Sequence, residues 1–199
     1  MSRTRRVEIV KKSQIDHDFF KIEEARLRYE RFDGTMSAEM VRLNLKRGDA
    51  VAAVVHDPAA DTLVLVEQFR YSTYENGPGW LLELPAGVIE PEHDADPAAT
   101  MRRELHEEIG YDVSDLRLIH TFYLSPGGSS ERVFLYYARV SPQNQRSAGG
   151  GLLAENEDIR VLTLSTNQVY DRMARGEIQD AKTLVGLQWL RLQPGSAAE

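Results

Sequence analysis

One segment constrains the fold more than any other: residues 96–110, "DPAATMRRELHEEIG", carry the start, stripe and stop signals of a single helix. Asp96 is a favourable N-cap, and Pro97 suits the first helical position. Gly110 stands where a helix commonly ends in a left-handed residue. An apolar residue at every fourth position gives the helix a stripe that would face a core: Met101, Leu105 and Ile109. The pattern therefore predicts an amphipathic helix over 97–109.

The rest of the chain is mainly a pattern of strands. Two more helices are predicted at 165–175 and 181–192, and "SPQNQRSAGGG" is predicted by its composition to be a mobile loop. Asp33-Gly34 is a hairpin signal. Alternating or β-branched runs predict strands at 18–31, 36–46, 50–57, 61–69, 80–87, 116–124, 131–140 and 158–164. Because helices and strands mix without a regular repeat, we expect a mixed α/β (α+β) fold with a mixed sheet flanked by helices.

Length and pattern together bound the domain organisation. A chain of 199 residues suits one domain with a small appended element. We expect residues 1–47 to form an N-terminal antiparallel β extension and 48–195 the main domain. Residues 196–199 belong to a tail predicted to be disordered.

Composition excludes several classes of function. The formal net charge of -7 argues against nucleic acid as a partner, because that would require a basic face. The absence of cysteine excludes disulfides and thiolate chemistry. No stretch approaches 18 apolar residues, so no membrane span is predicted, and the N-terminus does not resemble a signal peptide. The expected location is the cytoplasm.

Three glutamates share one face of the predicted helix: Glu104, Glu107 and Glu108. Like charges at this spacing repel each other by a few tenths of a kcal/mol per exposed pair. Arg103 could pair with one of them, but a divalent cation would offset the repulsion more, since carboxylate oxygens are preferred ligands of Mg²⁺ and Mn²⁺. The alternative is an ordinary solvated charged face.

The segment "RELHEEIGY" at 103–111, preceded by Gly87, resembles the Nudix box, the metal-binding loop–helix–loop of Nudix hydrolases. The chain is similar to the ADP-ribose pyrophosphatase branch, and to the related GDP-mannose pyrophosphatases, well beyond this box. The similar segments are "QFR" at 68–70, "WLLELPAG" at 80–87, "SPGGSSE" at 125–131, "ENEDIRV" at 155–161 and "GLQWL" at 186–190. The resemblance implies a Nudix fold and Mg²⁺-dependent hydrolysis of ADP-ribose to AMP and ribose 5-phosphate.

The resemblance also implies roles for individual carboxylates. Glu104, Glu108 and Glu157 would bind metal directly, together with the backbone carbonyl of Ala86. Glu107 would bind through water or support the other ligands. The resemblance implies two further catalytic roles. Arg103 would orient the glutamates, and Glu155 would be the base, with a helix glutamate such as Glu108 as the alternative base.

Substrate contacts follow from the same resemblance. Arg70 would contact phosphate, where a guanidinium can fork onto two oxygens. One of Phe19 and Phe20 would stack on the nucleobase of the partner subunit's substrate, with Arg42 and Arg47 nearby, which implies a homodimer with exchanged N-terminal strands. The remaining implied substrate-binding residues are Val88, Ser125, Pro126, Gly127 and Glu131.

The box departs from its pattern in one place. Fifteen residues separate Gly87 from Arg103, two more than the pattern has. The first glutamate position therefore falls on His93 or Ala95, and we expect Glu92 or Asp94 to substitute with activity retained. Two alternatives to ADP-ribose hydrolysis remain: a pyrophosphatase for GDP-mannose or another nucleoside diphosphate sugar, and an inactive Nudix domain that senses ADP-ribose.

Overall fold

The computed structural model describes residues 6–17, 20–90, 96–152, 154 and 156–193. The chain divides into two compact units. The first comprises Met1–Gly48 with Tyr123–Glu131, and the second comprises Asp49–Phe122 with Arg132–Glu199. The first unit therefore includes the 123–131 loop, which no sequence pattern had connected to the N-terminal segment.

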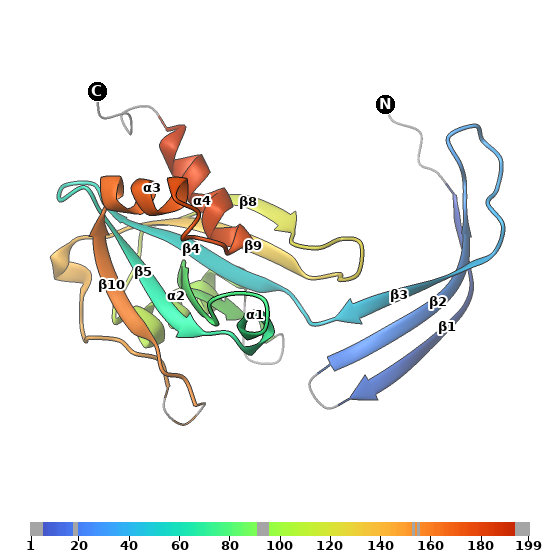
Figure 1. Cartoon of the computed structure of the whole chain (residues 1–199), viewed down its shortest axis with the longest axis horizontal. Helices are drawn as coiled ribbons and strands as arrows, with labels where there is room; N and C mark the ends of the chain where they lie inside the picture. The colour runs from blue at the N-terminus through green and yellow to red at the C-terminus, as the bar shows by residue number, and fades with distance from the viewer. Residues whose placement is uncertain (1–5, 18–19, 91–95, 153, 155, 194–199) are drawn as a thin grey trace. The chain divides into compact units, whose positions relative to one another are not determined.

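The first unit is built on a three-stranded antiparallel sheet in the order β1-β2-β3 (Figure 1). The strands are β1 Val7–His17, β2 Phe20–Tyr29 and β3 Met40–Lys46. Strand β1 was not predicted, because its charged and apolar residues do not alternate regularly. Strand β3 begins four residues later than expected, since the chain first turns through residues 31–35, where the Thr35 amide donates to Asp33 Oδ1 at 2.9 Å.

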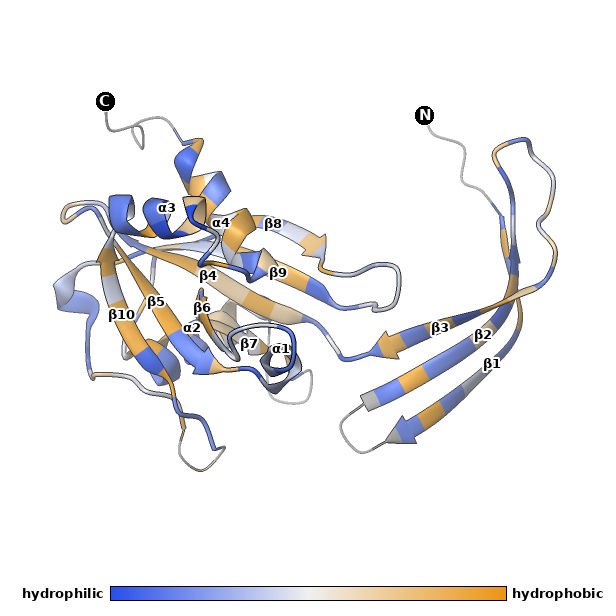
Figure 2. Ribbon diagram, in the orientation of Figure 1, coloured by the Kyte–Doolittle hydropathy of each residue, from blue (hydrophilic) through white to orange (hydrophobic). Residues whose placement is uncertain are grey.

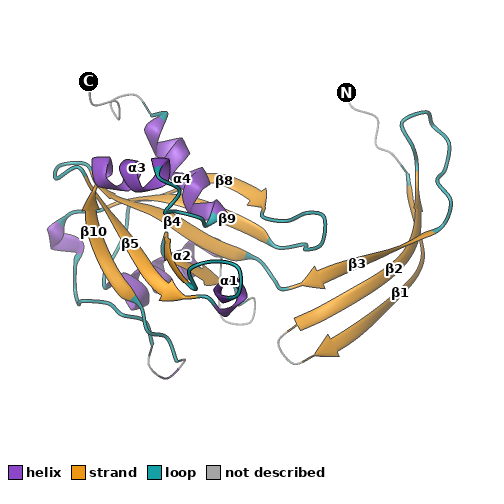
Figure 3. Ribbon diagram, in the orientation of Figure 1, coloured by secondary structure: helices purple, strands orange, loops and turns teal. Residues whose placement is uncertain are grey.

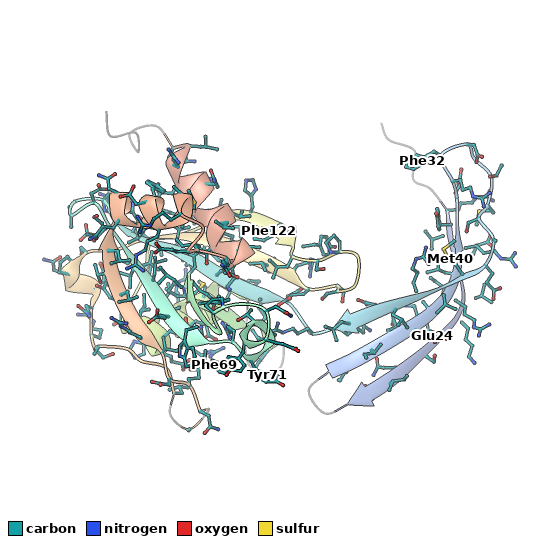
Figure 4. The ribbon with its side chains drawn as sticks, viewed as in Figure 1. Glu24, Phe32, Met40, Phe69, Tyr71 and Phe122 are labelled. Atoms are coloured by element: carbon teal, nitrogen blue, oxygen red, sulfur yellow. The ribbon has the colours of Figure 1, made fainter. Side chains whose placement is uncertain are left out.

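This sheet has little core of its own. Figure 2 shows hydrophobic residues scattered among hydrophilic ones along the three strands. Phe32, at the tip of the β2–β3 connection, is 93% exposed (Figure 4). The other large apolar side chains that the unit leaves exposed are Val7, Ile9, Val10, Ile15, Ile22, Tyr29, Val41, Leu43 and Tyr123.

The second unit contains a seven-stranded sheet with the main path β10-β5-β4-β9-β8. Its first strands are β4 Ala50–Asp57, β5 Thr62–Phe69, β6 Trp80–Glu83 and β7 Ala86–Val88. The later ones are β8 Leu116–Tyr123, β9 Arg132–Arg139 and β10 Arg160–Ser165. Strand β4 runs parallel to β9 and antiparallel to β5 and β7, so the predicted mixed sheet is confirmed.

Helices lie against both faces of this sheet (Figures 1 and 3). They are α1 Tyr71–Tyr74, α2 Pro97–Ile109, α3 Thr166–Ala174 and α4 Ala181–Arg191. Alternate residues of β4 separate the faces: Val51 and its second neighbours join the α2 core cluster, whereas Val54 lies under α4. A Cβ at Gly186 would lie 2.7 Å from Val54 Cγ2, so α4 approaches the sheet closely at this glycine. None of the described helices is long and apolar enough to cross a bilayer.

Helix α2 has the predicted bounds and caps. The Asp96 side chain accepts the Ala99 amide at 2.8 Å, and Gly110 ends the helix with a φ of 76°. Thr100 and the apolar stripe of α2 are fully buried against the sheet. The helix is therefore fixed at both ends and along one side, which makes it a rigid carrier for its polar residues.

Residues 141–151 differ from the predicted mobile loop. They contain a 3-10 helix, Pro142–Asn144, and the segment after it is hydrogen-bonded to the end of α2. Composition alone indicated mobility because Gly, Ser and Gln carry little apolar surface. Composition does not reveal the backbone hydrogen bonds that hold this segment in place.

Candidate active site

Two of the three glutamates of α2 point into the protein rather than into solvent. Glu104 is 9% exposed and Glu108 is 2% exposed, while Glu107 is partly buried. A solvated charged face would leave all three in water, so that alternative is wrong for Glu104 and Glu108. Buried carboxylates are costly unless they are paired or hold a cation, and their surroundings therefore matter.

Arg103 pairs with two of these carboxylates at once. Its Nη2 lies 2.9 Å from Glu104 Oε1, and its Nη1 lies 3.0 Å from Glu107 Oε2. A planar guanidinium can hold two acceptors in fixed directions. Arg103 thus has the geometry for the orienting role that the resemblance implied.

The side chain of Glu108 is held by the first residue of β7, and its surroundings disfavour its charged form. The Ala86 amide donates to Glu108 Oε2 at 3.0 Å, which ties β7 to the helix. Burial, joined by the charges of Glu104 and Glu157, raises the pKa of Glu108 to about 8, against the opposing effects of the Ala86 amide and Arg70. These causes show that Glu104, Glu157 and Arg70 all act on one buried carboxyl group.

The absence of a side chain at Gly87 leaves room for the carboxyl group of Glu104. A Cβ at Gly87 would lie 2.1 Å from Glu104 Cδ and 2.2 Å from its Oε1. No side chain larger than hydrogen fits there unless Glu104 moves. The glycine that begins the box is thus required by a close contact rather than by an unusual backbone angle.

A run of three glycines, Gly149–Gly151, joins the distant acidic loop to the same helix. All three have positive φ, and the Gly150 amide donates to the backbone oxygen of Glu108 at 2.9 Å. A Cβ at Gly149 would lie 2.4 Å from that oxygen. Beyond the run, the Leu152 amide donates to Glu157 Oε2 at 3.0 Å, which fixes this carboxylate close to the end of α2.

The donor set suits a hard divalent cation. Glu104, Glu108 and Glu157 would supply oxygen ligands to such a cation, and burial together with the charges of Glu104 and Glu157 raises the pKa of Glu108. In the part of the chain that the structure describes, no three such side chains meet as a finished metal cage. Arg103 and the Leu152 amide hold the carboxylates instead, so bound metal would compete with these donors.

Arg70 is engaged by a residue that sequence reasoning did not single out. Its Nε and Nη2 donate to Oε2 of Glu83 at 3.1 and 2.7 Å, and Glu83 is buried. Lys182, also buried, approaches the other oxygen of Glu83 at 3.3 Å. The sequence did contain a signal for this pairing. Glu83 is a lone glutamate inside the apolar segment "WLLELP", and a buried carboxylate requires a charged or hydrogen-bonding partner.

The remaining predicted substrate residues fall in different places. Val88 lies in β7, partly buried, within the second unit. Arg42 and Arg47 are exposed in the first unit. The 123–131 loop of that unit bonds to β3 through Leu45, and it carries four more of the predicted residues: Ser125, Pro126, Gly127 and Glu131.

Some predictions concern positions outside the described residues. These positions are Phe19, Glu155, Glu92, His93, Asp94 and Ala95. Phe20 begins β2, but its side chain is not described. The roles predicted for these residues remain predictions.

Comparison with known proteins gives consistent matches. The family model described as "NUDIX domain" matches residues 46–186. The ADP-ribose pyrophosphatase of Escherichia coli (strain K12) is 38% identical over 189 residues, covering 94% of this chain and 88% of that protein. The GDP-mannose pyrophosphatase of Escherichia coli O1:K1 / APEC is 32% identical over 194 residues, covering 95% and 97%. Among solved structures, "Crystal structure of ADP compounds hydrolase" has a TM-score of 0.72 at 20% identity, covering 98% and 100% of the two chains.

Proposed function

Because the chain belongs to the Nudix hydrolase family, we propose that it hydrolyses the diphosphate of ADP-ribose to AMP and ribose 5-phosphate. The observation that carries this proposal is the burial of Glu104 and Glu108 against Gly87 and Ala86, with the charge of Glu157 near enough to act on Glu108. A diphosphate needs its charge neutralised and an attacking water activated, which are tasks for carboxylates that hold divalent cations. The 38% identical relative named for ADP-ribose supports the choice of substrate.

We propose Mg²⁺, with Mn²⁺ as a substitute, as the bound metal. Glu104, Glu108, Glu157 and the carbonyl of Ala86 would hold it, and Glu107 would act through water. When bound, the metal would neutralise the diphosphate and lower the pKa of a coordinated water.

The side chains of this chain supply orientation and proton transfer. Arg103 holds Glu104 and Glu107 in fixed directions. The positive charge of Arg70 lowers the pKa of Glu108, so it acts on the carboxylates of the site. We therefore assign Arg70 to a contact with one of the substrate phosphates. Glu155 is the proposed base that takes the proton of the attacking water, and Glu108 is the alternative.

A second candidate substrate is GDP-mannose. The relative named for it covers almost all of this chain at 32% identity. The chemistry at phosphorus would be the same, so the choice between the two depends on contacts to base and sugar. A panel of nucleoside diphosphate sugars, scored by kcat/KM with phosphatase-coupled phosphate release, separates the two candidates.

We also propose that the chain forms a homodimer through its N-terminal β extension, residues 1–47, beside a catalytic domain of residues 48–195. The exposed apolar side chains of β1, β2 and β3 support this, because a three-stranded sheet needs a packed hydrophobic face for independent stability. Phe19, Phe20, Arg42 and Arg47 would then serve the partner's substrate.

The test uses Glu104→Gln and Glu108→Gln with Mg²⁺ and ADP-ribose. Each should lower kcat by about 10³-fold, since metal-assisted charge stabilisation contributes several kcal/mol. Glu67→Gln is the matched control, because Glu67 forms an exposed pair with Arg160 at 3.1 Å. Unchanged rates in both helix variants would contradict metal catalysis by α2. Tight ADP-ribose binding without turnover in the parent would instead identify a sensor.

A further inference from the structure

Arg70 lies at the end of β5, where the chain leaves the sheet. Its amide donates to the Gly79 oxygen at 2.6 Å, so its backbone is fixed to the segment before β6. Phe69, which ends β5, and Tyr71, which begins α1, flank it and are exposed (Figure 4). The Arg70 side chain is 36% exposed, so it is not closed off from solvent.

One oxygen of Glu83 determines how this guanidinium is aimed. Oε2 accepts from Nε and from Nη2 of Arg70, and the Gln68 amide group also donates to it at 3.3 Å. Only one edge of the guanidinium is used by Glu83. A guanidinium has five N–H donors, so the rest remain to be directed at an anion.

Glu83 is itself held from the other side. Lys182 Nζ lies 3.3 Å from Glu83 Oε1 and 2.9 Å from Asp180 Oδ1. Thr183 Oγ1 donates to Asp180 Oδ2 and accepts the Leu84 amide at 2.9 Å. The start of α4 is thus tied to both residues that end the β6 segment.

Stability does not account for this arrangement. Lys182 lies in the first turn of α4, where the helix dipole disfavours a cation. Burying a carboxylate with an ammonium group commonly stabilises no more than a well-packed apolar pair would. Two cations flank Glu83, and Lys182 also pairs with Asp180, so the four charges balance while Glu83 occupies only one edge of the Arg70 guanidinium.

We propose that Glu83 and Lys182 are positioning residues that aim Arg70 at the substrate diphosphate. This rests on the proposed function, in which Arg70 contacts phosphate. Lys182 fixes Glu83, and Glu83 presents one oxygen that sets the plane and direction of the guanidinium. Neither residue touches the reacting atoms.

The experiment is a double-mutant cycle on kcat and KM for ADP-ribose. Arg70→Ala should lower kcat/KM by about 100-fold, and Glu83→Gln by about 10- to 100-fold, since small misplacements of binding groups have such costs. The combined Arg70→Ala/Glu83→Gln variant should be within about twofold of Arg70→Ala alone. If the two effects multiply instead, Glu83 does not act through Arg70, and the inference is wrong.

Two further variants separate positioning from folding. Lys182→Met should raise KM more than it lowers kcat. Glu83→Gln/Lys182→Met, which removes both buried charges, should fold and still show the defect of Glu83→Gln. Glu67→Gln repeats the same substitution at an exposed pair on the neighbouring strand β5 and should change kcat/KM by less than about twofold. A fully active double variant would overturn the proposal.

A second readout does not depend on activity. The Arg70 Nε–H resonance, assigned by its loss in Arg70→Ala, should exchange with solvent faster in Glu83→Gln than in the parent. Unchanged exchange would overturn the inference. Failure of the proposed function would appear differently, as a parent that hydrolyses no nucleoside diphosphate sugar. If GDP-mannose is the better substrate, the same cycle is measured with it.

Discussion

The two units of the chain differ in how many of their apolar side chains are buried. The second unit buries a continuous cluster of apolar side chains on α2 and the sheet, and within it the polar residues of the site are tied to backbone and to each other. Among the described residues of the first unit, Ala25 is the one buried apolar side chain of the sheet, and many others are exposed. The proposed catalytic groups therefore lie in the well-buried second unit, and the proposed dimer surface lies in the first unit.

Among the changes that test this contrast between the units, the largest expected effect comes from Gly87→Ala, which disturbs the second unit at a very close contact. The new Cβ would lie 2.1 Å from the carboxyl carbon of Glu104, and a flexible side chain yields more easily than backbone. Glu104 should therefore turn away, lowering kcat by at least about 100-fold, with only a modest loss of melting temperature. Steady-state kinetics and calorimetry measure the two effects.

Gly128→Ala is the matched control, since no atom lies within 4 Å of a Cβ there. It should shift the free energy of unfolding by less than about 0.5 kcal/mol. Full activity in Gly87→Ala would mean that the position of Glu104 does not matter to catalysis.

The next prediction concerns the exposed sheet. Ile15, Ile22 and Leu43 share one face of β1, β2 and β3 and are all exposed. If this face is covered in a dimer, Ile15→Lys/Leu43→Lys should raise the dimer dissociation constant by about 100-fold or more, because each buried side chain contributes roughly 1.5–3 kcal/mol. Light scattering across a dilution series gives the constant.

Val185→Lys, at an exposed apolar residue of the second unit, should leave the dimer intact. A parent protein that is monomeric at micromolar concentration would contradict the dimer altogether.

A smaller effect concerns the second unit, where Glu108 should make the free energy of unfolding depend on pH. Burial raises the pKa of Glu108 from its ordinary 4.5 to about 8, so between these values the folded state holds a proton that the unfolded state has lost. Stability of the metal-free protein should therefore fall as pH rises through this window, by roughly 1 kcal/mol per pH unit. Urea denaturation in EDTA from pH 5 to 8 measures the slope.

Glu108→Gln should flatten that slope, because the amide does not titrate. The variant should also be more stable than the metal-free parent at pH 8. An unchanged slope would show that Glu108 is not the group responsible.

The smallest expected effect is at the start of the second unit. Arg132 donates to Asp49, with Nη2 at 2.5 Å from Oδ2, and this bond lowers the pKa of Asp49. A lowered carboxyl pKa contributes stability that is present above the ordinary value of 3.8 and is lost as pH falls through the folded pKa. Asp49→Asn should cost about 0.5 kcal/mol at pH 7 and almost nothing at pH 2. A cost that is independent of pH would assign the effect to packing.

Local signals predicted some features well. The bounds of α2 followed from Asp96, Pro97 and Gly110, since caps and breakers act on their immediate neighbours. The mixed sheet and the two C-terminal helices followed from hydrophobic periodicity. The family followed from residues 87–111 and the similar segments around them.

Long-range pairings were the part that the sequence did not reveal. Nothing near Arg70 in the chain indicates that its partner is Glu83, or that Lys182, 99 residues away from Glu83, holds that partner. The burial of Glu104 and Glu108 was hidden for the same reason, because helical spacing shows which residues share a face but not what covers it. Strand β1 was missed because pairing with β2, rather than its own pattern, makes it a strand.

The three glycines after residue 148 have a consequence for how the protein can vary. They anchor the chain to the end of α2 through backbone atoms alone, while Arg146 and Ser147 bond upstream to the Gly110 oxygen. Part of the segment before these anchors is also tied to the end of α2, because the Asp112 amide donates to the Asn144 oxygen at 2.9 Å and Tyr111 forms a β-bridge with Gln145. Residues 142 and 143 are accordingly the place to graft a tag or a recognition loop, because an insertion there leaves these bonds and the position of Glu157 relative to α2 unchanged.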